Sequence, residues 1–136
     1  MIGRRSVFGA VGVALAAVLA GCGGPNRAKD WEEAVKKVEG VTGAHLERVT
    51  GAEFQRFVRG TIETEGEHRA ETLRIYGAAM HALAQAAAAS GDEELICGAV
   101  VGRGRDGHEV NPFDLRPDLE LQRKRLDAVG LKDFLD

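Results

Sequence analysis

Cysteine, serine and aromatic residues are scarce in this chain of 136 residues, and its 18 basic residues are slightly outnumbered by 21 acidic ones. It has two cysteines and 5% aromatic residues, and after residue 6 its only serine is Ser90. The formal net charge of −3 argues against a nucleic-acid-binding protein, because such proteins are usually basic. With 44% hydrophobic and 29% charged residues, the chain has the composition of a soluble globular domain. That balance excludes a disordered tail, a coiled-coil rod and a polytopic membrane protein.

The first twenty residues hold a disproportionate share of the apolar side chains. Arg4 and Arg5 form a short cationic start, and residues 7–20 are an apolar run of 14 residues. As a helix this run would be about 21 Å long, which is shorter than a hydrocarbon core of about 30 Å. Its length is typical of the apolar region of a signal peptide rather than of a membrane anchor.

A short motif at the end of this run indicates where the chain is processed. Leu19-Ala20-Gly21-Cys22 resembles the lipobox of bacterial lipoproteins, and the whole chain resembles the small lipoproteins of high-GC Gram-positive bacteria. The resemblance implies cleavage between Gly21 and Cys22, a diacylglyceryl group on the Cys22 thiol, and a location on the extracytoplasmic face of the cell membrane. The alternatives are a chance match and cleavage after an ordinary A-x-A site.

The route of export stays open between two alternatives. Arg4-Arg5-Ser6-Val7-Phe8 is similar to a twin-arginine motif, but Gly3 stands where that motif prefers Ser or Thr, and no basic residue follows Phe8. The general secretory route fits equally well. Cleavage after residue 21 leaves 115 residues and removes two arginines, which changes the formal net charge from −3 to −5.

With Cys22 acylated, the other cysteine has no intramolecular partner. Cys97 lies in an apolar run at residues 95–101 and is expected to be a buried free thiol, with a reactive thiol as the alternative. The fold is therefore expected to have no disulfide bond.

The pattern after residue 21 predicts a flexible tether at residues 22–29 and one domain at residues 30–136. Asp30 is predicted to cap a first helix that carries the apolar stripe of Trp31 and Val35 and ends near Gly40. Strands are predicted at residues 44–50, 54–64, 95–101 and 108–110, with a turn at residues 51–53, a bulge at Gly60 and a hairpin turn at Asp106-Gly107.

Helical spacing over residues 68–89 predicts a second long helix, and a short third helix is expected at residues 122–129. Leu115, Leu119 and Leu121 are expected to cover an edge of the core. The order α-β-β-α-β-β predicts a small two-layer α+β sandwich, in which both main helices lie on one face of an antiparallel sheet. This order resembles a ferredoxin-like sandwich whose first strand has moved to the end.

The chain offers few groups for catalysis. Ser90 follows a predicted helix and is expected to lie in a turn or cap, and no Thr has a base nearby in the sequence. No two of the four histidines have the i, i+4 spacing of a helical zinc site, and the cysteine pair of metal-binding ferredoxin-like modules is missing, so no metal or cofactor is expected. Glu63, Glu65 and His68 are the one candidate acid–base cluster, with a solvated strand face as the alternative interpretation.

These observations favour a lipid-anchored, extracytoplasmic and non-catalytic module. It would bind a protein, an envelope component or a small apolar ligand, and no nucleic acid. The alternative is an envelope enzyme that uses Glu63, Glu65 and His68.

Overall fold

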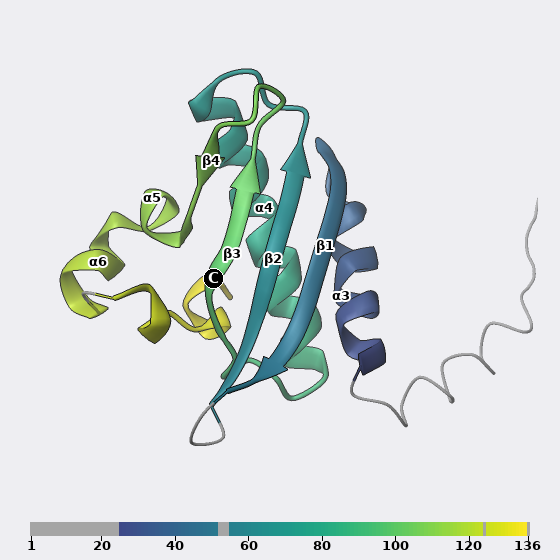
Figure 1. Ribbon diagram of the computed structural model, residues 1–136, viewed down its shortest axis with the longest axis vertical. Coiled ribbons are helices and arrows are strands. Elements are labelled where there is room, and N and C mark those ends of the chain that lie inside the picture. Colours follow the sequence, from purple (N-terminus) through teal and green to yellow (C-terminus); the bar gives the residue numbers. More distant parts are fainter. Residues whose placement is uncertain (1–24, 52–54, 124, 136) are drawn as a thin grey trace, which may run out of the picture.

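The computed structural model describes residues 25–51, 55–123 and 125–135 of the chain. The proposed leader, Gly21, Cys22, Phe54 and most of the predicted turn at residues 51–53 lie outside the described residues. The described part is an α+β domain with a sheet of four strands and helices packed against it, as the sequence predicts (Figure 1). None of its helices is long and apolar enough to cross a membrane.

The first helix, α3 (Pro25–Lys36), begins five residues earlier than predicted. The interpretation of Asp30 as an N-cap is therefore wrong, and residues 25–29 of the expected tether are helical. Proline suits a helix start because its fixed φ is already helical and its missing N–H would have had no partner. Ala28 adds one turn to the apolar stripe, since it lies three residues before the fully buried Trp31 and is itself only 7% exposed.

The sheet has the strand order β1 (Val41–Thr50), β2 (Arg56–Thr64), β3 (Ile96–Arg103) and β4 (Glu109–Val110). The β1–β2 and β3–β4 pairs are antiparallel, but β2 and β3 are parallel, so the prediction of a wholly antiparallel sheet is wrong. The cause is α4 (Arg69–Ala89), whose 21 residues return the chain along the sheet before β3 begins. The element order is compatible with the permuted ferredoxin-like arrangement, which stays a prediction.

Helices α3 and α4 cover one face of the sheet, as predicted (Figure 1). The side chains of Trp31, Tyr76 and Leu83 are fully buried between these helices and the strands. The Tyr76 hydroxyl donates a hydrogen bond of 2.7 Å to the carbonyl oxygen of Val100. The opposite face of the sheet is left uncovered by these two helices.

Gly60 is not a bulge in the β1–β2 pair, because it pairs with Leu46 in continuous register. The irregularities lie between Val41 and Gly43, and between Phe57 and Arg59. Gly60 has a φ of +147°, and a Cβ atom there would lie 1.9 Å from the carbonyl oxygen of the adjacent strand. Close approach of the two backbones therefore requires glycine.

The predicted hairpin at Asp106-Gly107 is confirmed. Strands β3 and β4 pair antiparallel on either side of it, and Gly107 has a φ of +93°. The backbone N–H of Gly104 donates a hydrogen bond of 2.9 Å to the carbonyl oxygen of His108 and closes the turn.

The C-terminal segment differs from the predicted helix at residues 122–129. It consists of α5 (Pro112–Leu115), α6 (Pro117–Arg123), η2 (Leu126–Ala128) and η3 (Leu131–Phe134). Prolines begin both α helices, and the Asn111 side chain caps α5 by accepting hydrogen bonds from two backbone N–H groups. Leu119 is buried as expected and Leu115 packs against the core, whereas Leu121 is 81% exposed and does not cover it.

The end of this segment extends the sheet beside the first half of β3. The backbone N–H of Cys97 donates to the carbonyl oxygen of Val129 at 2.8 Å, and that of Leu131 donates to Leu95 at 2.9 Å. Gly130 forms an isolated antiparallel bridge with Ile96. The C-terminal residues therefore occupy the edge of β3 that the short β4 leaves free.

Candidate functional site

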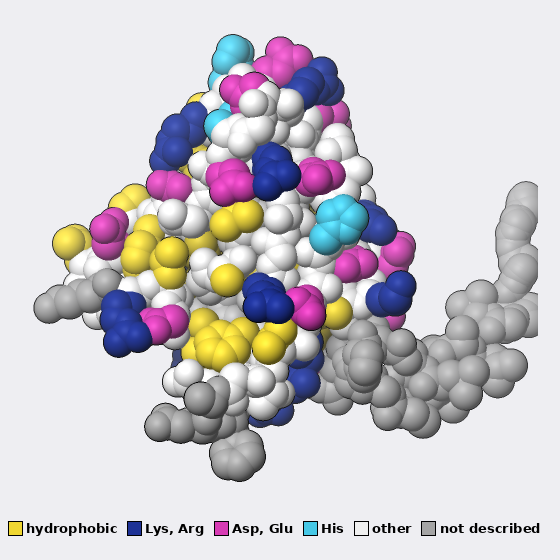
Figure 2. Space-filling view, in the orientation of Figure 1, with side chains coloured by type: hydrophobic (Ala, Val, Ile, Leu, Met, Phe, Trp, Pro, Cys, Tyr) yellow, Lys and Arg dark blue, Asp and Glu magenta, His cyan; other side chains and the backbone are white. Residues whose placement is uncertain are grey.

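The face of the sheet opposite the two helices carries rows of side chains across the strands. Buried residues such as Leu46, Val58 and Val100 point toward the helices, so the residues between them point to the open face. The rows on the open face are Val49–Phe57–Ile96, Glu47–Arg59–Ala99, His45–Thr61–Val101 and Glu63–Arg103–Glu109. Figure 2 shows this face, on which paired acidic and basic side chains alternate with apolar ones.

Two ion pairs tie the strands together on this face. Arg59 Nε lies 2.9 Å from Glu47 Oε1, and Arg103 lies 2.8 Å from Glu109. The hydrogen bond and charge of Glu109, and then the charge of Glu63, raise the pKa of Arg103. The central part of the face forms an open groove of about 460 Å³. Its lining comprises Glu32, His45, Leu46, Glu47, Arg59, Gly60, Thr61, Ala99 and Val101.

Glu63, Glu65 and His68, the predicted acid–base cluster, form no hydrogen bond or ion pair with one another. Glu63 lies on the open face opposite Arg103. Glu65 is exposed just after β2, and its backbone N–H donates to the carbonyl oxygen of Gly40 at 2.9 Å. His68 is exposed at the N-cap of α4, and its side chain forms no capping bond. In the described part of the chain, no three His, Cys, Asp or Glu side chains are grouped as metal ligands.

A chain of three polar side chains that the sequence did not reveal joins the β3–β4 turn to α4. His108 Nε2 lies 2.9 Å from Thr72 Oγ1, and His108 Nδ1 contacts the carboxylate of Asp106. Asp106 also accepts a hydrogen bond of 3.0 Å from the backbone N–H of His108. This backbone bond and then the imidazole bond lower the pKa of Asp106. We call these three residues the polar clasp.

No Thr has a base nearby in the sequence, but the fold places the imidazole of His108 beside Thr72 in the polar clasp. A hydroxyl, an imidazole and a carboxylate in this order are the groups that activate a nucleophile. Here, however, the Thr72 side chain is fully buried. A Cβ atom at Gly66 would lie 2.3 Å from Thr72 Oγ1, and one at Gly104 would lie 2.8 Å from it. Backbone therefore covers the hydroxyl on both sides, and the clasp links two elements instead of facing a substrate.

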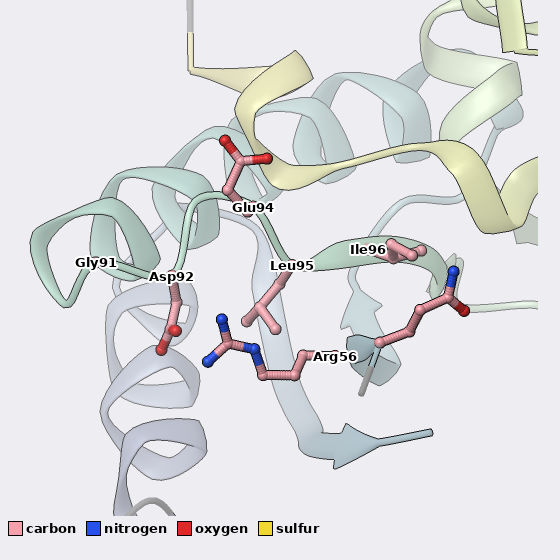
Figure 3. A pocket seen from close by; sticks show the side chains of 7 residues that line it. Arg56, Gly91, Asp92, Glu94, Leu95 and Ile96 are labelled. Carbon is pink, nitrogen blue, oxygen red and sulfur yellow. The ribbon is translucent and has the colours of Figure 1, made fainter. Parts of the chain in front are cut away.

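A second hollow of about 260 Å³ lies between the end of α4 and the start of β3 (Figure 3). The residues that line it are Gln55, Arg56, Gly91, Asp92, Glu94, Leu95 and Ile96. Asp92 is 4% exposed and lies 3.5 Å from an Arg48 nitrogen. The guanidinium of Arg56 points into the hollow (Figure 3), and it forms no hydrogen bond or ion pair with any other described residue.

The structure places Ser90 and Cys97 where the sequence predicts them. Ser90 is the C-cap of α4, and its hydroxyl donates to the carbonyl oxygen of Ala86 at 3.3 Å. Cys97 is a buried free thiol in β3, and burial raises its pKa. A buried neutral thiol is a poor nucleophile, so the alternative of a reactive cysteine has no support.

The predicted lipidation residue, Cys22, and the predicted cleavage after Gly21 stay predictions, because both lie outside the described residues. Comparison of the chain with protein-family models, curated proteins and solved structures gives no match.

Proposed function

We propose that this chain is a lipid-anchored, extracytoplasmic binding module without catalytic activity. The observation that carries the proposal is the series of a cationic start, an apolar run of 14 residues and the lipobox-like Leu19-Ala20-Gly21-Cys22, followed within three residues by helix α3. Two acyl chains on Cys22 would provide stable anchoring, because one chain alone binds membranes only marginally.

The open face of the sheet is the proposed surface for a protein or envelope partner. It presents polar, charged and apolar side chains side by side around a groove of about 460 Å³. Interfaces between proteins that also exist separately are about as apolar as the rest of a protein surface, so a mixed face of this kind suits such a partner. The alternative of an envelope enzyme draws no support from geometry, because Glu63, Glu65 and His68 form no bond to one another.

Metabolic labelling tests the anchor. Labelled palmitate should enter the wild-type protein, and the Cys22→Ala variant should stay unlabelled. The matched control is Cys97→Ala, which removes the other cysteine of the chain and should keep the label. Labelling of Cys22→Ala, or a wild-type protein that fractionates away from membranes, would refute the proposal.

Crosslinking on intact cells tests the binding surface. A photoreactive residue at Thr61 lies in the groove, whereas one at Gln85 lies on the exposed side of α4. A partner that is captured at Thr61, and not at Gln85, supports the open face as the binding surface. Equal capture at both positions, or capture at Gln85 alone, contradicts it.

A further inference from the structure

The link between the proposed lipid and the domain is short, and this limits how the domain can lie on a membrane. Pro25, the first residue of α3, follows Cys22 by three residues. Three residues of extended chain span at most about 11 Å. If Cys22 carries the lipid, as the proposed function requires, the start of α3 therefore lies within about that distance of the membrane surface.

Several other segments lie at the same end of the domain as the start of α3. Helix α3 and β1 run in opposite directions, since only residues 37–40 join them, and a hydrogen bond of 2.7 Å joins Glu32 to the backbone N–H of Leu46. The start of α3 is therefore near the end of β1. The start of β2 and the link between α4 and β3 lie at that end too (Figure 1), because Phe57 pairs with Ile96. We call Lys29, Thr50, Arg56 and residues 91–95 the α3 end.

We propose that the α3 end rests on the membrane surface and that Arg56 binds the phosphate of an anionic lipid headgroup. In the hollow at this end, the acidic side chains already have basic partners. Arg48 lies 3.5 Å from Asp92, and Lys132 lies 3.2 Å from Glu94. Arg56 lines the same hollow with its guanidinium unpaired among the described residues.

The chemistry of this hollow fits a phosphate group. A guanidinium donates two parallel hydrogen bonds to phosphate oxygens, and Gln55 lines the same hollow. Lys29 is exposed in the first turns of α3 and adds a second cation without an ion pair among the described residues. The hollow, of about 260 Å³, has room for a headgroup phosphate.

The expected effect of Arg56 is modest and measurable. One basic side chain near an anionic membrane contributes a factor of about five to the ratio of docked to undocked molecules, which corresponds to about 1 kcal/mol. Because the lipid keeps the domain at the surface, this factor changes the orientation of the domain rather than the amount bound.

Hydrogen–deuterium exchange on the lipidated protein tests the proposal. Relative to detergent, phosphatidylglycerol vesicles should slow exchange at residues 91–96 and leave residues 104–108, at the opposite end of the domain, unchanged. Arg56→Gln should reduce this slowing about fivefold. The matched control is Arg105→Gln, because Arg105 lies at that opposite end and is paired with Glu67 at 3.2 Å. Circular dichroism of both variants checks that they fold.

Each arm has an outcome that overturns the proposal. Equal slowing at both ends, or the same slowing in phosphatidylcholine vesicles, contradicts docking through an anionic headgroup. Slowing by inorganic phosphate in detergent assigns the hollow to free phosphate instead. A protein that does not float with the vesicles refutes the lipid anchor itself, whereas a floating protein without selective slowing refutes only the docking.

Discussion

Removal of the Thr72 hydroxyl should destabilise the domain by a measurable and bounded amount. The Thr72→Val variant keeps the volume of this fully buried side chain and leaves His108 Nε2 without the partner that lies 2.9 Å away. A typical hydrogen bond contributes about 1 kcal/mol net to stability. The His108 side chain is 25% exposed, so water can reach the imidazole and will replace part of this bond. We therefore expect a loss of about 0.5–1 kcal/mol.

Denaturant unfolding, followed by the fluorescence of Trp31, measures this loss. Trp31 is the only tryptophan and is fully buried, so its environment changes when the domain unfolds. The midpoint should fall while the slope stays constant, and the melting temperature should fall by about 2–6 °C. The matched control is Thr61→Val, which makes the same change on the open face and should shift stability by less than about 0.5 kcal/mol.

A double-mutant cycle with His108→Ala separates the clasp from other effects of the two substitutions. If the hydroxyl acts through the imidazole, the two losses will not add, and the coupling energy will be about 0.5–1 kcal/mol. Fully additive losses would show that the two side chains do not interact in solution. That result would refute the polar clasp as a link between the β3–β4 turn and α4.

Three further predictions concern single positions. Gly60→Ala should lower the free energy of unfolding by at least about 2 kcal/mol, because its Cβ would lie 1.9 Å from a carbonyl oxygen. Gly107→Ala, whose Cβ would meet nothing within 4 Å, should lower it by about 1 kcal/mol, and thermal unfolding compares the two variants. The pKa of the Cys97 thiol is raised in the folded protein, so the free energy of unfolding should fall as pH rises above about 8.5, the pKa of a thiol in the unfolded chain. The Cys97→Ala variant should show a smaller fall in unfolding curves recorded between about pH 8 and 10. Because the pKa of Asp106 is lowered in the folded protein, its contribution to stability is present above about pH 3.9 and is lost as pH falls further. Asp106→Asn should therefore weaken the dependence of the melting temperature on acid pH. An unchanged dependence would contradict the contact between Asp106 and His108.

The long periodic segments of this fold could be predicted from the sequence because burial leaves a pattern in them. In α4, Tyr76, Met80 and Leu83 recur at helical spacing and are all buried. The hairpin turn was predictable because Gly107 requires a positive φ that glycine adopts freely. These features depend on neighbours in the sequence, and local physics decides them.

Features that depend on distant segments could not be predicted. The parallel pairing of β2 with β3 depends on where α4 returns the chain, and no residue of either strand signals it. The start of α3 was missed because residues 25–29 are mostly polar in sequence and carry no apolar periodicity, although Ala28 is buried. The prediction that Leu121 covers the core was wrong, because α6 buries Leu119 and leaves the Leu121 side chain 81% exposed.

The candidate sites were hidden for the same reason. Thr72 and His108 are 36 residues apart, and Arg48 and Asp92 are 44 apart, so spacing along the chain carries no sign of either contact. One local signal exists. An Asp that begins a turn commonly accepts a hydrogen bond from the residue two positions later, and this predicts that Asp106 bonds to the backbone of His108.

The early start of α3 is the finding that links the proposed anchor to the orientation of the domain. A tether at residues 22–29 would reach about 28 Å if extended, which would let the domain turn freely above a membrane. A helix rises only 1.5 Å per residue and is stiff, and α3 is held to the sheet by Trp31 and Val35, both fully buried. Because residues 25–29 are helical, the stretch from Cys22 to the described fold spans at most about 11 Å. An anchor at Cys22, as proposed above, would therefore keep the start of α3 within about 11 Å of the membrane surface.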